Sequence, residues 1–328
     1  MNAPAIVILG SGALATARRL QQCYPQALIH GLAERVTDVD RSYQDFGATL
    51  RQLYQQDTPI IALCAAGIVI RSLAPVLLEK GAEPPVLAVA EDGSAVVPLL
   101  GGLAGVNVLA REIAAGLGIA AAITTSGELR FGTCLLNPPS GYALADLELG
   151  KRFVSDLLAG EAVRVEGAAP WLADARLPKD AQARLTIHVG SEARQPSANE
   201  LLIHPRNVLV AVSAAQPELA ESVRDALQRS GIALPSLACL LANERDMADP
   251  VLHEAAAALA VPLRFAAAQG SLAQLALQAV PQSSPIAIGK HVAIAVADQP
   301  LDIASIGLPR GRLAVIGLGP GAADLMVP

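Results

Sequence analysis

The chain has 328 residues, of which 52% are hydrophobic but only 3% aromatic, and its formal net charge at neutral pH is −6. This charge, without any basic cluster, argues against a nucleic-acid partner. Residues 93–110 are uncharged, but Pro98 and several glycines interrupt them, so they do not predict a membrane span. The N-terminal residues lack the layout of a signal peptide. We therefore expect a cytoplasmic protein of two or three domains.

The cysteines and histidines are too dispersed to predict a metal site. None of them shows the paired spacing of a zinc ligand set, so we expect reduced core thiols and no metal. The four cysteines are Cys23, Cys64, Cys134 and Cys239, and the five histidines are His30, His188, His204, His253 and His291.

The first residues follow a strand–turn–helix pattern. Residues 5–9 are apolar and predict a strand, and Gly10, Ser11 and Gly12 precede an amphipathic helix. A dinucleotide-binding loop has a similar pattern, but its third glycine falls on Ala15 and the next strand-like run, residues 27–30, does not end on an acid. We interpret the glycines as a tight turn, with a nucleotide-dependent oxidoreductase as an alternative.

Residues 42–80 continue the alternation of helix and strand. A helix is predicted over residues 42–55, a buried strand over 59–64, and a second helix over 68–80 that Pro75 should interrupt. The loop before this second helix contains Gly67, and Arg71 lies one turn beyond it. Arg71 could bind a substrate carboxylate bidentately or form an ordinary surface salt bridge.

Residues 86–125 contain the most glycine-rich stretch of the first half. Residues 86–90 and 95–99 predict a hairpin around Asp92 and Gly93, and residues 119–125 predict a further strand. Between them, a bend containing Gly101, Gly102 and Gly105 leads into a helix. Backbone N–H groups at such a helix start can bind an anion, or the glycines can simply allow close packing. The helix has one apolar stripe, formed by Val106, Leu109, Ile113 and Leu117.

These patterns predict an α/β protein with two doubly wound α/β domains on either side of a small middle α/β module. The first domain is predicted over residues 1–127, the middle module over 128–206 and the last doubly wound domain over 207–305. Residues 306–328 are predicted to hold a linker and then a strand and glycine loop that open another domain.

Residues 59–125 resemble the amino-terminal domain of the cobalt-precorrin-5A hydrolase family (CbiG) of cobalamin biosynthesis. The resemblance is carried by IALCAAGIVIRSLAPVLLEKG, PVLAVAEDGSAVVPLLGGLAGVNVLAREIAAGLG and AITT. It implies opening of a lactone on a corrinoid, with loss of a two-carbon fragment as acetaldehyde. Such a reaction needs a positioned water, a general base and donors for developing oxyanion charge.

The resemblance also implies which residues form the site. Glu91 would be the base or would orient the water, although a solvated turn residue is the alternative. The substrate would be a corrinoid, with or without cobalt, and no cofactor is expected for this part; a homodimer is compatible with the pattern. The implied substrate-binding residues are Gly67, Arg71, Gly101, Gly102, Gly105, Asn107, Thr124 and Thr125.

The tail GRLAVIGLGPGAADLM is similar to the opening of the tetrapyrrole methylases, and most similar to precorrin-3B carbon-17 methyltransferase. This resemblance implies an intact fusion of hydrolase and methyltransferase that uses S-adenosylmethionine. Gly317, Gly319 and Gly321 would lie near that cofactor.

The chain departs from the hydrolase family at three positions. Leu103 stands where the family usually has a histidine, Ala90 where it has an aspartate and Met247 where it has a lysine. Leucine can neither accept a proton nor hold a carboxylate. Two interpretations follow: an active hydrolase that relies on another base, or a non-catalytic corrinoid-binding scaffold beside the methyltransferase.

Overall fold

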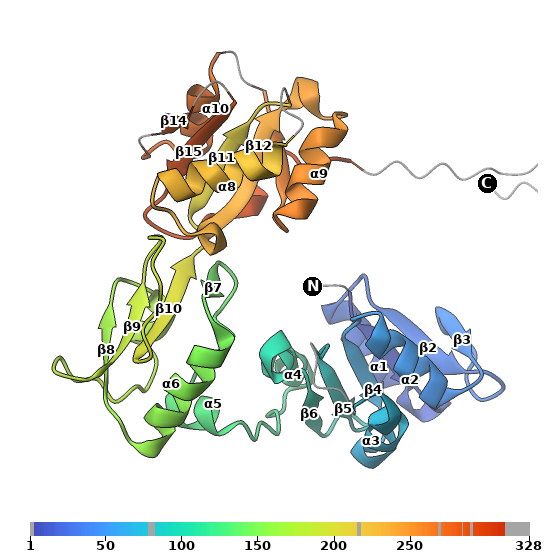
Figure 1. Cartoon of the computed structure of the whole chain (residues 1–328). Helices are drawn as coiled ribbons and strands as arrows, with labels where there is room; N and C mark the ends of the chain where they lie inside the picture. Colours follow the sequence, from blue (N-terminus) through green and yellow to red (C-terminus); the bar gives the residue numbers. More distant parts are fainter. Residues whose placement is uncertain are drawn as a thin grey trace, which may run out of the picture. The chain divides into compact units, whose positions relative to one another are not determined.

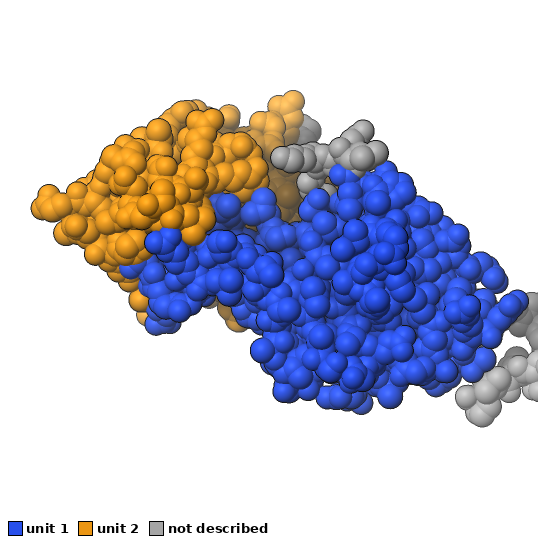
Figure 2. All heavy atoms as spheres, turned by 90° about the horizontal axis from the view of Figure 1, so that it is seen from below, with its two compact units in different colours: residues 1–137, 174–177 blue, residues 138–173, 178–328 orange. Residues whose placement is uncertain are grey.

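The computed structural model describes residues 3–77, 83–214, 218–267, 270–283, 285–288 and 291–311. The chain divides into two compact units, residues 1–137 with 174–177 and residues 138–173 with 178–328 (Figure 2). Three predicted features lie outside the described residues: the strand predicted within residues 306–328, the last residues of the helix predicted over 68–80, and the glycines Gly317, Gly319 and Gly321. The predicted domain boundaries stay predictions.

Unit 1 is built on a six-stranded sheet of order β3-β2-β1-β4-β5-β6 (Figure 1). The first five strands are parallel and β6 is antiparallel to β5, as expected for the hairpin around Gly93. The central strands are apolar throughout because helices cover both faces. The strands are β1 (Ala5–Ile8), β2 (Leu28–Leu32), β3 (Arg41–Tyr43), β4 (Ile60–Leu63), β5 (Val86–Val89) and β6 (Val96–Leu100).

Alternate residues of each central strand point into two separate cores. One core packs Ile6, Ile61 and Leu87 against helices α1 and α4, and the other packs Val7 and Ala62 against α2 and α3. This doubly wound arrangement was predicted from the alternation of strand and helix. The helices are α1 (Leu14–Cys23), α2 (Phe46–Gln55), α3 (Ala66–Leu73), α4 (Val106–Leu117) and α5 (Ser126–Phe131).

The helix predicted over residues 42–55 begins later than predicted. Residues Arg41–Tyr43 form β3 instead, and the Tyr43 hydroxyl donates to the Ile8 carbonyl oxygen at 2.7 Å. Asp45 then caps α2 by accepting from the Ala48 amide at 2.7 Å. The break predicted at Pro75 is confirmed, because α3 ends at Leu73 and a short 3-10 turn, Ala74–Val76, follows.

The strand predicted over residues 119–125 was wrong. Only Ala121 pairs with β6, as a single bridge to Val96 in which the Ala122 amide donates to the Val96 carbonyl oxygen. The next residue of β6 whose backbone faces this segment is Pro98. Proline has no amide hydrogen to donate, so the hydrogen-bond ladder cannot continue. The chain instead enters α5, which the sequence did not predict.

Unit 2 contains a small sheet of order β7-β10-β9-β8. Helix α6 packs on it through Phe153 and Leu157, and Asp146 caps this helix by accepting from the Leu149 amide at 2.8 Å. Gly160 ends α6 in the left-handed conformation. The elements are β7 (Tyr142–Leu144), α6 (Leu147–Ala159), β8 (Val163–Glu166), α7 (Pro170–Ala173), β9 (Leu185–Val189) and β10 (Glu200–Pro205).

The second sheet of unit 2 has five strands in the order β13-β12-β11-β15-β14. Helices α8 and α9 pack on one face and α10 on the other, so this part is also doubly wound. The α/β fold class predicted from the sequence is therefore confirmed. The elements are β11 (Val208–Val212), α8 (Leu219–Arg229), β12 (Leu237–Asn243), α9 (Pro250–Ala258), β13 (Leu263–Ala266), α10 (Leu272–Ala279), β14 (Ile286–Ile288) and β15 (Val292–Val296).

Among the helices of the described residues, none combines the length and the apolar character that crossing a bilayer requires.

Candidate functional site

The order of strands in unit 1 reverses between β1 and β4, the two central neighbours. In open α/β sheets, ligands bind outside the carboxyl ends of the strands at such a switch point. The loop after β1 contains Gly10 and Gly12, and the loop after β4 contains Ala65 and leads into α3. We call this the carboxyl edge of the sheet, and the opposite end of the same strands the amino edge.

Glu91 follows β5 and reaches across the carboxyl edge. Its Oε2 lies 3.6 Å from the position of a Cβ atom built on Gly12, which belongs to the loop after β1. The side chain therefore spans the end of β4 and places an exposed carboxylate over the switch point. This contact brings together residues 79 positions apart in the sequence (91 − 12), and their local patterns did not predict it.

The backbone of Glu91 is fixed by helix α1. Thr16, buried in α1, donates from Oγ1 to the Glu91 carbonyl oxygen at 2.7 Å. The turn that follows is closed by Asp92, whose carboxylate accepts from the Ser94 amide at 2.9 Å and from the Ser94 hydroxyl at 2.6 Å. These bonds hold the Glu91 main chain in one place.

A buried thiol lies beneath the carboxylate. Burial, together with the negative charge of Glu91, raises the pKa of Cys64 to about 11. A thiol with this pKa stays protonated at neutral pH and is a poor nucleophile. Glu91, by contrast, is a carboxylate open to solvent, and such a group can accept a proton from water.

Arg71 lies on the exposed side of the same edge, in the last turn of α3. Its Nη1 lies 3.3 Å from the position of a Cβ atom on Gly67, so the guanidinium folds back over the start of the helix. Within the described ranges, no carboxylate pairs with Arg71. The guanidinium is thus presented to solvent beside the loop after β4.

The glycine bend lies at the amino edge. Because β6 is antiparallel to β5, Leu100 pairs with Val86 at the beginning of β5, and the bend follows directly. Gly101 has φ +81° and a Cβ atom there would lie 2.5 Å from the Pro84 carbonyl oxygen, so this position requires glycine. Gly105 has φ +92°, and the Val106 amide donates to the Gly101 carbonyl oxygen at 3.1 Å. Packing and backbone conformation thus account for both glycines, whereas Gly102 is exposed.

Asn107 and Thr125 meet beside the first turn of α4. The Asn107 amide donates to Thr125 Oγ1 at 2.9 Å and to Glu128 Oε1 at 2.6 Å. Arg111 pairs with the other oxygen of Glu128 at 2.5 Å, and Glu128 is only 4% exposed. This polar cluster ties α4 to α5, so the Asn107 side chain is already occupied. Thr124, next to it, is exposed.

The structure therefore separates the predicted site residues into two groups. Glu91, Gly67 and Arg71 lie at the carboxyl edge, and the residues of the bend, with Asn107 and Thr125, lie at the amino edge. Sequence reasoning missed Thr16, Arg111 and Glu128. Of these three, only Glu128 belongs to a recognisable sequence pattern, because Thr125 and Glu128 have the spacing of a capping box at the start of a helix. In the structure, however, the Glu128 carboxylate accepts from Asn107.

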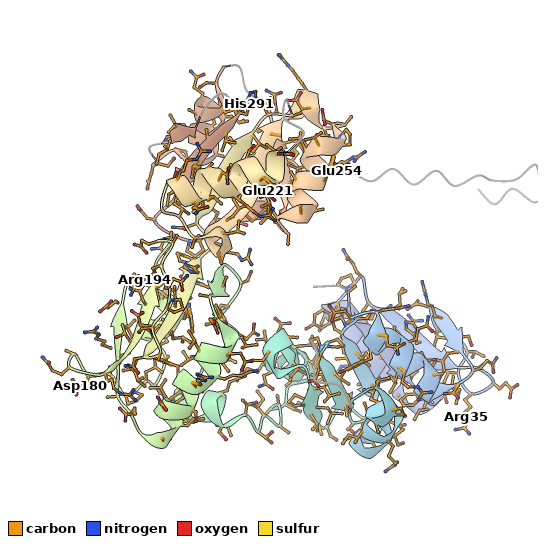
Figure 3. All side chains as sticks on the ribbon, viewed as in Figure 1. Arg35, Asp180, Arg194, Glu221, Glu254 and His291 are labelled. Carbon is orange, nitrogen blue, oxygen red and sulfur yellow. The ribbon has the colours of Figure 1, made fainter. Side chains whose placement is uncertain are left out.

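The histidines of unit 2 lie on several elements, with His188 on β9 and His204 on the neighbouring strand β10. His291, labelled in Figure 3, precedes β15, and its Nδ1 lies 2.9 Å from Ser213 Oγ. His188 lies between Glu166, with its Nδ1 at 3.3 Å, and Glu192, with its Nε2 at 3.6 Å. No group of three or more His, Cys, Asp or Glu residues in the described part of the chain could hold a metal ion.

Residues 48–128 match the family model described as cobalamin synthesis G N-terminal. This range includes Glu91 and Arg71 at the carboxyl edge, and also the bend and the Asn107 cluster at the amino edge. It leaves the whole of unit 2 outside the match.

Two curated relatives have the same description, cobalt-precorrin-5A hydrolase. The protein from Salmonella typhimurium strain LT2 is 33% identical over 126 residues, and the one from Priestia megaterium is 27% identical over 133 residues. Each alignment covers 38% of this chain and 36% of the relative, so the chain spans about a third of the length of the curated relatives it matches.

A solved structure from Sulfolobus solfataricus, described as that of a cobalamin biosynthesis protein G homologue, also resembles the chain. The identity is 14% and the TM-score 0.39, with 90% of this chain and 96% of that chain covered. By sequence, the matching part of this chain is similar to proteins of cobalamin synthesis.

Proposed function

We propose that the chain works in cobalamin biosynthesis as a cobalt-precorrin-5A hydrolase. It would open the lactone of a corrinoid intermediate, with or without cobalt, and release acetaldehyde at the carboxyl edge of unit 1. The observation that carries the proposal is the Glu91 carboxylate, which lies over the switch point between β1 and β4. The match of residues 48–128 to the cobalamin synthesis G N-terminal family supports the same assignment.

Glu91 would act as the general base. A water held between its carboxylate and the loop after β1 would lose a proton to Glu91 as its oxygen bonds to the lactone carbonyl carbon. The ring C–O bond then breaks and frees an alkoxide on the carbon that carries the methyl group. The alkoxide electron pair forms the C=O bond of acetaldehyde as the C–C bond to the macrocycle breaks, and the macrocycle takes up the electrons of that bond and then a proton. Backbone N–H groups after Gly10 and at the start of α3 are the available donors for the oxyanion.

Arg71 would anchor the substrate. Corrinoid intermediates carry several acetate and propionate side chains, and a guanidinium binds such a carboxylate bidentately. Its position over Gly67, exposed beside the loop after β4, supports this role. Gly101, Gly105, Asn107 and Thr125 would then serve in packing and polar support at the amino edge rather than in substrate contact. The exposed Gly102 and Thr124 lie at the same edge, away from Glu91.

Leu103, which stands where the hydrolase family usually has a histidine, is 44% exposed on the glycine bend. It lies at the amino edge, the length of a strand away from Glu91. The proposed chemistry therefore needs no histidine at this position.

The tail supports a further proposal, based on its resemblance alone. An intact fusion would add methyl transfer from S-adenosylmethionine by a precorrin-3B carbon-17 methyltransferase, with Gly317, Gly319 and Gly321 near the cofactor.

The direct test incubates the purified chain with cobalt-precorrin-5A and measures acetaldehyde. Release that is lost in the Glu91→Ala variant supports the hydrolase. Glu254→Gln, at an exposed position of α9, is the control for loss of one negative charge. Binding of the corrinoid without release would contradict the hydrolase and favour the scaffold. Titration with nicotinamide cofactors tests the oxidoreductase alternative at Gly10 and Gly12, and saturable binding there would also contradict the proposal.

A further inference from the structure

The amino edge of unit 1 contains a cavity of about 340 Å³. Its floor is formed where strands β1, β2 and β4 begin, at Pro4, Ala27 and Pro59, and its walls are the end of α1 and the first half of α4. Four-residue parallel strands are roughly 13 Å long, so their length separates this cavity from Glu91 at the carboxyl edge. The cavity belongs to neither the proposed catalytic site nor the polar cluster around Glu128.

The size and lining of the cavity fit a small apolar body. A cavity of about 150 Å³ holds one benzene ring, so this one has room for roughly two rings. Ala27, Pro59, Val108 and Leu109 give it a largely apolar wall, as in most small-molecule sites. Val108 is 45% exposed and lies on the rim.

The polar groups of the cavity are negative or neutral. Glu112 lies on the rim, and its Oε2 accepts from the Tyr24 hydroxyl at 2.6 Å, which leaves Oε1 available to a ligand. Burial, followed by the bond to Glu112, raises the pKa of Tyr24, so this hydroxyl remains a donor at neutral pH. No lysine, arginine or histidine lines the cavity within the part of the chain that the structure describes.

Helix α1 adds to the negative potential. The helix ends at Cys23, with Tyr24 as its C-cap, and both residues line the cavity. The carbonyl end of a helix carries partial negative charge, and α1 has no basic residue in its last turn to offset it. A carboxylate and a helix carboxyl terminus around an apolar wall favour a cation and disfavour an anion.

We propose that this cavity binds a small cationic amphiphile, with an apolar body of about two fused rings and a single ammonium group directed to Glu112 and the end of α1. The site is independent of the proposed hydrolase activity, since its groups do not contact the carboxyl edge. The cavity favours a cation, whereas a binding site for corrinoid carboxylates would favour an anion.

Three indole compounds of nearly equal size test the charge preference. Tryptamine, tryptophol and indole-3-acetate would be titrated into the full chain by isothermal calorimetry. We expect tryptamine to bind about fivefold more tightly than tryptophol, because its ammonium group gains one ion pair with Glu112 at the rim. Indole-3-acetate should bind most weakly, because it is an anion. Equal affinities for tryptamine and indole-3-acetate would overturn the proposal, and so would no binding of any of the three.

Two variants locate the site. Glu112→Gln keeps an acceptor for the Tyr24 hydroxyl but removes the charge, so tryptamine should bind about fivefold more weakly while tryptophol binds as before. Val108→Trp places a large side chain at the rim and should abolish binding of both. Glu148→Gln, an exposed glutamate of α6, is the control for charge. Unchanged tryptamine binding by Glu112→Gln in a chain with unchanged thermal stability would overturn the assignment.

Discussion

The two ends of the sheet in unit 1 are formed by the same strands but differ in chemistry. At the carboxyl edge, Glu91 and Arg71 are both exposed, and so is Gly12, while Gly67 lies half-buried in the first turn of α3. At the amino edge, the glycine bend is packed against Pro84 and the neighbouring cavity is apolar, with Glu112 at its rim. A glycine-rich bend before a helix is therefore not by itself a place for an anion.

The difference comes from the direction of one strand. If β6 were parallel to its neighbours, the bend would lie beside Glu91; because β6 is antiparallel, the bend lies at the other end of the sheet. The hairpin around Gly93 thus decides which residues can share a site. Substitutions at each edge should have correspondingly different effects.

The largest effect on stability is expected at Gly101. Gly101→Ala would place a Cβ atom 2.5 Å from the Pro84 carbonyl oxygen at a φ of +81°. We expect the free energy of unfolding to fall by about 2–4 kcal/mol, from the strained φ and the displaced backbone. Urea denaturation measures it, with Gly102→Ala as the matched control because nothing lies within 4 Å of a Cβ atom there. Equal stabilities of the two variants would show that the bend is not tightly packed.

A smaller loss is expected for Asn107→Ala. This change removes the donor to Thr125 and to the buried Glu128 carboxylate, and it should destabilise the chain by about 1–3 kcal/mol. Thr124→Ala, on the exposed neighbouring residue, should change stability by less than about 0.5 kcal/mol. If corrinoid affinity fell in Asn107→Ala while stability did not, the amino edge would be the binding edge.

Thr16→Val tests whether the hydrogen bond from Thr16 positions Glu91 at the carboxyl edge. The valine keeps the shape of the buried side chain but cannot donate to the Glu91 carbonyl oxygen, which should cost about 1 kcal/mol in stability. Because Glu91 is then held less firmly, we expect kcat for acetaldehyde release to fall while KM changes little. Thr49→Val, which removes a hydroxyl bond within α2, is the matched control and should leave kcat unchanged. A fall in stability without any change in kcat would limit Thr16 to a structural role.

The smallest effect distinguishes two cysteines. Cys64 is buried at the carboxyl edge with its pKa raised to about 11, whereas Cys23 is exposed at the amino edge. Iodoacetamide at pH 8 should modify Cys23 and leave Cys64 intact, because the folded chain keeps the Cys64 proton. Mass spectrometry of the alkylated peptides measures the difference in labelling between the two cysteines, and rapid labelling of Cys64 at pH 8 would contradict its burial.

The raised pKa of Cys64 also makes stability depend on pH. Between pH 9 and 11 the unfolded chain loses the Cys64 proton before the folded chain does, so the free energy of unfolding should decline with pH over this range.

Most of the fold could be predicted because its signals are local. Helix α6 has Asp146 before it and Gly160 after it, and the apolar stripe of α4 begins at Val106 and is buried as its spacing predicts. The failures are non-local. The segment at 119–125 is apolar enough for a strand, but Pro98 on the neighbouring strand ends its pairing. The strand β3 was missed because its three residues carry no period of their own.

The candidate site could be predicted only in part. The sequence placed Glu91 in a turn after a strand and Arg71 one turn after Gly67, and both positions agree with the structure. The closeness of Glu91 to Gly12, and the bond from Thr16, depend on the order of strands, which no local pattern encodes. For the same reason, the distance between Glu91 and the glycine bend could not be foreseen.

The decisive measurement is the rate of acetaldehyde release from cobalt-precorrin-5A by Glu91→Gln, together with corrinoid binding by the same variant. Glutamine keeps the shape and the turn but cannot accept a proton, so we expect kcat to fall by about 100-fold or more with affinity retained. Release by Glu91→Gln at the rate of the unsubstituted chain would contradict the assignment of the reaction to the carboxyl edge.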